Sequence, residues 1–352
     1  MLLSASTGLS KTNYLMMQPI WAGIGLLACL MAALGDYRWL KKSGWIPWVL
    51  LAVALVLLVA VLTWKKINGA SRWMHFGKFT LQPSEIAKLA LIIALAYYCE
   101  RCQRKMPTFV QGVVIPGLIV GAVLGLIFLE PDVGTALLLG AVSSAMLLIA
   151  GIRWRYFLPP LIIFAIGLGL FLYKNPMRSE RIYSWLHLEE TKQDKGLQAY
   201  QAMVALGAGG PTGVGLGDGR QKLGFVPEHH TDFIFSVIGE ELGLVATLLV
   251  VLAFIAITIS GAYIAWNARD TFGMLLAAGI TFLIAFQAVI NIGVVTSALP
   301  NKGLSLPFIS YGGSNLVLML ACVGLLLNVA QNAGEPGSAL RSVLKPSAST
   351  AV

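Results

Sequence analysis

Charged residues are scarce in this chain. Only 12% of its 352 residues are Asp, Glu, Lys or Arg, whereas 57% are hydrophobic. So few charged side chains cannot cover the surface of a water-soluble domain of this length. Together with a mean hydropathy of +0.78, this scarcity excludes an ordinary globular protein and predicts an integral membrane protein.

Cysteine is also scarce, with four residues: Cys29, Cys99, Cys102 and Cys322. All but Cys102 fall in or at the ends of apolar segments, so we expect free thiols rather than a disulfide framework. The spacing of Cys99 and Cys102 resembles half of a zinc site, but no second pair or nearby His completes it. We therefore predict no protein metal site, and no segment resembles a nucleic-acid-binding module.

Long apolar runs dominate the chain. A helix needs about 20 apolar residues to cross about 30 Å of hydrocarbon. Nine segments fit, near 16–34, 45–63, 84–99, 109–129, 133–151, 155–173, 232–266, 271–298 and 305–331. The pattern predicts an all-α, polytopic helical bundle over 1–333, with one large outer loop at 174–231. A Ser/Ala/Pro-rich tail, 334–352, is expected to be disordered.

Lys and Arg in short loops indicate the orientation of a membrane protein. Lys41, Arg104 and Arg153 lie in alternate loops, and Arg341 lies in the tail. We expect these loops and the C-terminus to be cytoplasmic, although the basic loop 64–83 departs from the rule. The net charge of +9 is then spread over both faces, and the basic residues outside indicate an anionic ligand there.

The motifs NGASRW (68–73) and QPSEIAK (82–88) place charged residues around the start of one apolar segment. Pro83 and Glu85 suit the first turn of a helix, and Glu85 and Lys88 are spaced as an i, i+3 pair. Lys88 lies in an otherwise apolar segment, so its charge needs a partner or a polar cavity. We predict substrate contacts for Arg72, Glu85 and Lys88.

Two further motifs connect membrane segments. In EPDVGTA (130–136), Asp132 suits a helix N-cap, but the same position presents a carboxylate at the outer boundary. In LPNKGLSLPFISYGGSNL (299–316), Pro and Gly break the helical pattern. Irregular backbone at membrane depth requires a protein or water-filled environment, so Lys302 and Ser314 are candidate residues of a polar cavity. We predict substrate contacts for both, and for Asp132.

The Gly-rich stretch GAGGPTGVGLGDGRQK (207–222) does not follow a strand, which argues against a dinucleotide-binding loop. Its backbone N–H groups and Arg220 are suited to binding a diphosphate. A merely flexible outer loop explains the same composition.

Acidic and histidine residues cluster in VPEHHTDFIFSVIGEELG (226–243), at the start of another apolar segment. Helix capping by Thr231 or Asp232 is the simpler explanation. Glu228 and His230 lie close to Asp232 in the sequence, however, and Glu240 lies roughly 12 Å deeper along the helix. A cap alone therefore explains the cluster incompletely, and the candidate site residues are Glu228, His230, Asp232 and Glu240.

Four ordered motifs, which span nearly the whole chain, resemble the SEDS family of shape, elongation, division and sporulation proteins. They are NGASRW with QPSEIAK (68–88), GVGLGDGRQKLG (213–224), VPEHHTDFIFSVIGEELG (226–243) and LPNKGLSLPFISYGGS (299–314). The Lys-Gly-Leu form of 299–314 and the Ile-Gly-Glu-Glu-Leu-Gly form of 238–243 are more similar to its division branch, FtsW, than to its elongation branch, RodA. The family has ten membrane helices. Residues 1–7 resemble only the end of its first helix, so we expect a truncated start.

The resemblance implies a peptidoglycan glycosyltransferase that polymerises lipid II on the outer face of the bacterial inner membrane during cell division. It matches Asp232 to the family's proposed catalytic aspartate, and Glu85 and Lys88 to a further acid and base. It also implies a class B penicillin-binding protein and other divisome membrane proteins as partners, and a divalent cation, Mg²⁺ or Mn²⁺, as a candidate cofactor. A lipid II flippase and a non-catalytic scaffold are the alternatives.

Overall fold

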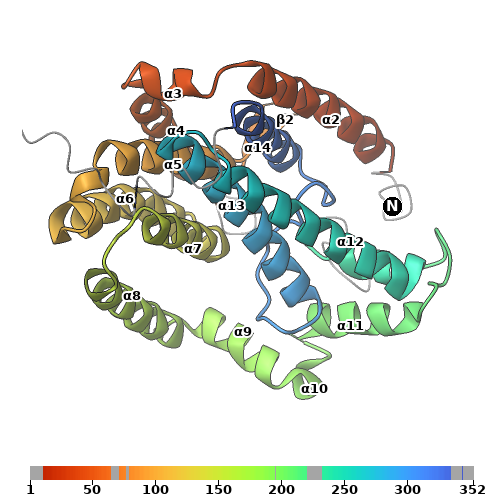
Figure 1. The fold of residues 1–352 in the computed structure, drawn as a ribbon. Coiled ribbons are helices and arrows are strands. Elements are labelled where there is room, and N and C mark those ends of the chain that lie inside the picture. Colours follow the sequence, from red (N-terminus) through yellow and green to blue (C-terminus); the bar gives the residue numbers. More distant parts are fainter. Residues whose placement is uncertain are drawn as a thin grey trace, which may run out of the picture. The chain divides into compact units, whose positions relative to one another are not determined.

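The computed structural model describes residues 11–64, 71–76, 79–194, 196–219, 232–333 and 343. Each of the nine predicted apolar segments contains a helix (Figure 1): α2 (Lys11–Leu34), α4 (Ile46–Leu62), α5 (Pro83–Arg101), α6 (Ile115–Leu129), α7 (Val133–Ile149), α8 (Trp154–Lys174), α12 (Ile234–Trp266), α13 (Thr271–Val295) and α14 (Gly313–Gln331). Within the described ranges, six helical segments are long and apolar enough to span a membrane, and α4 and α7 are shorter apolar helices. The fold is that of a polytopic helical membrane protein.

The remaining elements are short. They are α3 (Arg38–Lys42), η1 (Gln103–Lys105), the π-helical turn η2 (Val110–Val114), α9 (Pro176–Leu186), α10 (Leu188–Thr191), α11 (Leu197–Gly209) and the strands β1 (Met74–Phe76) and β2 (Phe79–Leu81). The segment 174–231, predicted as a large outer loop, is largely helical where it is described. The two strands pair antiparallel, with Met74 opposite Leu81, so the all-α prediction missed one small hairpin.

The chain divides into two compact units. The first comprises 1–22, 160–256 and 285–312, and the second comprises 23–159, 257–284 and 313–352. Both α12 and α13 contribute residues to each unit. The predicted tail 334–352 lies outside the described residues, apart from Val343.

The core of the second unit is formed by α4, α5, α6 and α7. Leu58 of α4 and Leu91 of α5 pack with Ile127 and Leu139 from the other two helices. Small residues of α5, including Ala87, allow close approach of neighbouring helices. Because α5 is buried along most of its length, the charged residues in its first two turns lie in the interior of this unit.

In the first unit, α12 is broken at Gly243, which has φ 74° and ψ −171°. The break frees backbone groups, and the Gly-rich segment after α11 satisfies them. Leu244 N donates to Gly210 O at 2.9 Å, and Val214 N donates to Glu240 O at 2.9 Å. These exchanges replace the helical hydrogen bonds that the break removes.

The glycines of this segment allow the close approach. A Cβ atom at Gly209 would collide with Gly239 O, and one at Gly213 would collide with Glu241 O. The described part of the Gly-rich stretch therefore packs against the broken helix. Neither interpretation from the sequence, a flexible loop or a diphosphate-binding loop, predicted this packing. Arg220 lies outside the described residues.

Candidate functional site

Asp232 lies two residues before α12, and two features of the first unit hold it. Asn291 of α13 donates from Nδ2 to Asp232 O at 2.8 Å and to Leu304 O at 2.6 Å. Gly303 lies against the Asp232 carboxylate, because a Cβ atom built on Gly303 would be 2.7 Å from Asp232 Oδ2. The backbone of Asp232 and the segment after α13 are therefore tied to the same buried amide.

The Pro/Gly-broken segment 299–312 is non-helical, as its sequence predicted. Side chains of the protein form hydrogen bonds with some of the backbone groups of this irregular segment. Gln287 Nε2 donates to Ser305 O at 2.9 Å, and Leu306 N donates to Ser310 Oγ at 2.7 Å. Lys302 precedes Gly303, and burial lowers the pKa of its ammonium group. A half-buried lysine therefore directly precedes, in the sequence, the glycine that contacts Asp232.

Glu240 is buried in α12, with 3% of its surface exposed. Gly219 of the Gly-rich segment lies against it, because a Cβ atom there would be 2.9 Å from Glu240 Oε2. The neighbouring Glu241 is buried as well. Protein therefore encloses Glu240, while its predicted role as a substrate-binding residue stays a prediction.

In the second unit, Arg72 and Asp132 support the link between α6 and α7. Arg72 Nε donates to Glu130 O at 3.0 Å, and its Nη2 donates to Pro131 O. Asp132 caps α7 by accepting from Thr135 N at 3.2 Å and from Thr135 Oγ1 at 2.9 Å. The capping interpretation of Asp132 is confirmed, and a substrate role for Arg72 or Asp132 stays a prediction.

Glu130 is a buried acid that the sequence interpretation did not select. Its side chain is fully buried, and neither carboxylate oxygen has a hydrogen-bond partner in the part of the chain that the structure describes. Burial and the Asp132 carboxylate raise the pKa of Glu130 to about 8, whereas Arg72 acts in the opposite direction. The sequence did carry a signal for this buried acid, because Glu130 directly follows an apolar segment and lies two residues before a second acid, Asp132.

Glu85 and Lys88 form an ion pair inside the second unit. Lys88 Nζ lies 2.8 Å from Glu85 Oε1 and 2.9 Å from Oε2. The side chains are 1% and 6% exposed for Lys88 and Glu85 respectively. The predicted i, i+3 pairing is therefore present, and it supplies the partner that a charge within α5 requires.

Ser314, in the first turn of α14, connects that helix to the hairpin region. Its Oγ donates to Thr80 O at 2.9 Å and accepts from Gln82 N at 3.3 Å. These bonds give Ser314 a structural role beside the start of α5. Its predicted contact with substrate stays a prediction.

The predicted residues Glu228 and His230 lie outside the described residues. Elsewhere in the described ranges, no group of three or more His, Cys, Asp or Glu side chains is arranged to hold a metal ion.

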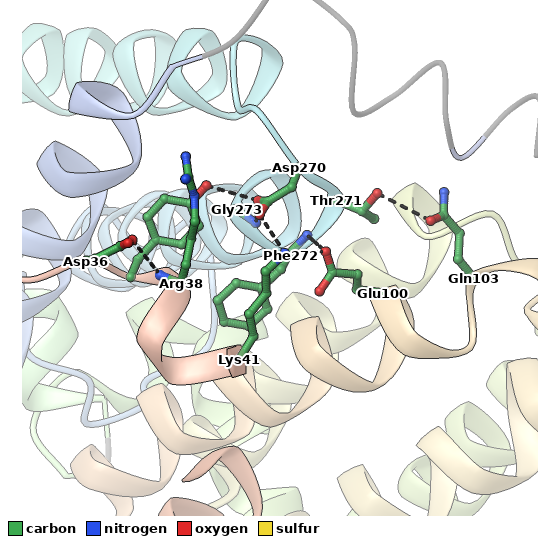
Figure 2. A network of polar contacts seen from close by, with 10 residues as sticks. Asp36, Arg38, Lys41, Glu100, Gln103, Asp270, Thr271, Phe272 and Gly273 are labelled. Carbon is green, nitrogen blue, oxygen red and sulfur yellow. Dashed lines mark hydrogen bonds and ion pairs between the residues drawn. The ribbon is translucent and has the colours of Figure 1, made fainter. Parts of the chain in front are cut away.

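A second polar network, also missed from the sequence, surrounds Asp270 (Figure 2). Lys41 Nζ lies 2.6 Å from Asp270 Oδ2 and 2.8 Å from Glu100 Oε1, and Tyr37 and Gly273 donate to Asp270 Oδ1. Burial raises the pKa of Tyr37 to about 12. The network joins the ends of three helices, α3, α5 and α13, within the second unit.

The helices and the acidic and basic residues at their ends define a multi-pass membrane protein with polar groups enclosed among apolar helices. The chain belongs to the FtsW/RodA/SpoVE family of cell cycle proteins, whose model matches residues 1–335.

Relatives and solved structures agree with this family. The chain is 42% identical over 319 residues to a probable peptidoglycan glycosyltransferase FtsW from Geobacter metallireducens, covering 90% of this chain and 84% of that protein. It is 39% identical to the stage V sporulation protein E of Bacillus subtilis, covering 89% and 86%. The rod shape determining protein RodA of Thermus thermophilus matches with a TM-score of 0.69 and 28% identity over 94% of this chain and 91% of that one.

A chain from a structure of a peptidoglycan synthase complex that coordinates polymerization and crosslinking matches with a TM-score of 0.79. Its identity to this chain is 28%, and the match covers 94% of this chain and 93% of that chain.

Proposed function

We propose that this protein is a peptidoglycan glycosyltransferase that polymerises lipid II at the outer face of the inner membrane during cell division. The family match and the relatives named FtsW support the activity. The observation that carries the chemistry is Asp232, an acid placed at a helix start and held against Gly303 and Asn291.

In the proposed reaction, a sugar hydroxyl of one substrate attacks the anomeric carbon of the other. The new bond joins the hydroxyl oxygen to that carbon, and the bond from the carbon to the lipid diphosphate breaks. Asp232 accepts the hydroxyl proton as general base. One base acting opposite the leaving group is the arrangement of inverting glycosidases, so we expect inversion at the anomeric carbon.

The departing diphosphate requires positive charge. Lys302 is a candidate in the first unit, because it is half-buried and directly precedes in the sequence the glycine that contacts Asp232. Arg72, Lys88 and Arg220 are further candidates on charge alone. A Mg²⁺ or Mn²⁺ ion carried by the diphosphate would supply additional neutralisation.

A class B penicillin-binding protein is the proposed partner, together with other membrane proteins of the divisome. The match to a chain of a complex that coordinates polymerization with crosslinking supports such a pairing. The proposed topology places Asp232 outside and the C-terminus in the cytoplasm.

The test is polymerisation of labelled lipid II by purified protein, with and without its cognate penicillin-binding protein. Asp232→Asn preserves side-chain size but cannot accept the proton, so we expect a loss of roughly 10²–10⁴ in rate with normal membrane insertion and partner binding. Asp194→Asn, at an exposed acid of the same unit, is the matched control and should retain activity.

Near-normal polymerisation by well-folded Asp232→Asn protein would contradict the catalytic role and direct attention to Glu228 or His230. Lipid II translocation without polymerisation by the unaltered protein would instead support a flippase. Polymerisation that comes from the partner alone would support a scaffold.

A further inference from the structure

We propose that Asn291 and Gly303 are positioning residues that set the location of the Asp232 carboxylate. This inference rests on the proposed function, because it assigns to both residues an effect on the reaction through Asp232. Neither residue stood out in the sequence as a candidate for the chemistry.

Asn291 fixes the backbone at Asp232. The residue is 1% exposed, and its single amide nitrogen bonds both Asp232 O and Leu304 O. The donor comes from α13, so two non-helical segments are joined to one helix by one buried side chain. Removing it would leave two carbonyl groups without their donor and would free Asp232 from α13.

Gly303 limits the position of the Asp232 carboxylate, at the end of that side chain. The nearest atom to a Cβ at this position would be Asp232 Oδ2, at 2.7 Å, followed by Asp232 Cγ at 3.7 Å. Real Cβ atoms do not approach another atom so closely, so the carboxylate would have to move. The φ angle of Gly303 lies outside the left-handed region, so alanine introduces a steric change without backbone strain.

Position matters because a general base must lie within hydrogen-bond reach of the proton it accepts. A displacement of about 1 Å is enough to lower a rate by about 100-fold. The Asn291 bonds and the missing Gly303 side chain therefore act on the same quantity, the distance from the Asp232 carboxylate to the reacting hydroxyl.

The test compares Gly303→Ala and Asn291→Leu in the purified full-length protein with labelled lipid II. Leucine has the same number and branching of side-chain heavy atoms as asparagine and removes both donated bonds. Since Asn291 Oδ1 accepts no hydrogen bond from the residues described, it adds no further loss. Gly167→Ala is the glycine control, because a Cβ there would meet nothing within 4 Å. Asn267→Leu is the asparagine control, because this residue directly follows α12 and, among the described residues, its amide donates to Tyr263 O at the end of that helix.

For both positioning variants we expect kcat to fall about 10- to 100-fold. We expect KM for lipid II to change less than about threefold, because substrate binding does not depend on the carboxylate's exact location. Gly303→Ala should keep the melting temperature of the parent protein, since only the end of one side chain must move. Both controls should retain the parent kcat.

Full kcat in Gly303→Ala would overturn the proposal, and so would full kcat in a folded Asn291→Leu protein. If Asn291→Leu does not fold, Gly303→Ala decides alone. An inactive Asp232→Asn protein combined with normal positioning variants would refute this inference and leave the proposed function intact. An active Asp232→Asn protein would refute the catalytic assignment itself.

Discussion

Three buried acids of the second unit show how local contacts decide what a carboxyl group does. Glu85 has the Lys88 ammonium group, and Asp132 has two donors from Thr135. Glu130 has neither within the described structure, and burial raises the pKa of its carboxyl group to about 8. We therefore expect Glu130 to be largely protonated at neutral pH.

Glu130→Gln should remove a pH dependence of stability. The ordinary pKa is 4.5, and the folded value is about 8, so the folded protein binds more protons between these values than the unfolded chain does. The contribution of protonated Glu130 to folding stability is fully present below about pH 4.5 and is lost as the pH rises through about 8. The folding constant should fall by at most about tenfold per pH unit. Melting temperatures of parent and variant between pH 5 and 9 measure this difference.

The Asp270 network should not add to the pH dependence of stability between about pH 5 and 9. The Lys41 hydrogen bond lowers the pKa of Asp270 although burial opposes it, and burial raises the pKa of Tyr37 to about 12. Both groups therefore titrate outside this pH range. Glu189→Gln, at a side chain that is 83% exposed, is the matched control. The same pH slope in Glu130→Gln and in the parent would contradict the assignment.

Lys88→Ala should destabilise the protein far more than removal of a surface lysine. Loss of one partner leaves a buried charge uncompensated, which costs about 3–5 kcal/mol. Lys192→Ala is the control, because its pair with Glu189 is exposed and such pairs contribute about 1 kcal/mol or less. Thermal unfolding measures both, and polymerisation assays test the predicted site role.

A charge-swapped protein, Glu85→Lys with Lys88→Glu, should recover part of the lost stability because a pair is restored. If the charge-swapped protein is no more stable than either single variant, direct pairing of the two side chains is not the source of the lost stability. Normal polymerisation by Lys88→Ala would remove this lysine from the site.

At the scale of elements, the break in α12 depends on a second segment. The residues after α11 supply donors and acceptors to the turn around Gly243, and their glycines permit the approach. A broken helix without such partners would expose unsatisfied backbone groups to an apolar environment. The break and the Gly-rich segment are therefore one structural feature of the first unit.

Gly213→Ala should disrupt this feature. Gly213 has φ +84°, and a Cβ atom there would collide with Glu241 O. An L-residue in the left-handed region costs about 1–2 kcal/mol before any collision is counted, and a backbone atom cannot move aside as a side chain does. We expect a lower melting temperature and reduced polymerisation, whereas Gly167→Ala, where a Cβ would meet nothing within 4 Å, should match the parent. An unchanged melting temperature in Gly213→Ala would contradict this account of the glycines.

At the scale of the whole molecule, the orientation is the property to test. Basic residues in the short loops around Lys41, Arg104 and Arg153 predict that these loops and the C-terminus face the cytoplasm. A fluorescent reporter that folds only in the cytoplasm should therefore be active when fused after Val352. A phosphatase that is active only outside should be inactive there and active within 174–194. The reverse result would invert the proposed topology.

Sequence patterns determined the elements because apolar length and helix-start chemistry are local properties. Nine apolar runs predicted nine helices, Pro83 predicted the start of α5, and Asp132 predicted the cap of α7. The last run was predicted from residue 305, but α14 begins at Gly313. Pro307 and Gly312 signalled the break, while hydrophobicity alone extended the segment.

The sequence by itself determined a polytopic helical membrane protein, its polar motifs and the spacing of the Glu85–Lys88 pair. Tertiary structure alone decided which distant residues meet. Asn291 and Asp232 are 59 residues apart, and no local pattern encodes an amide that reaches a carbonyl across that separation. The same holds for Gly303 against the Asp232 carboxylate and for the Gly-rich segment on α12. Such contacts arise from packing, in which the absence of one Cβ atom matters only once the facing group is in place.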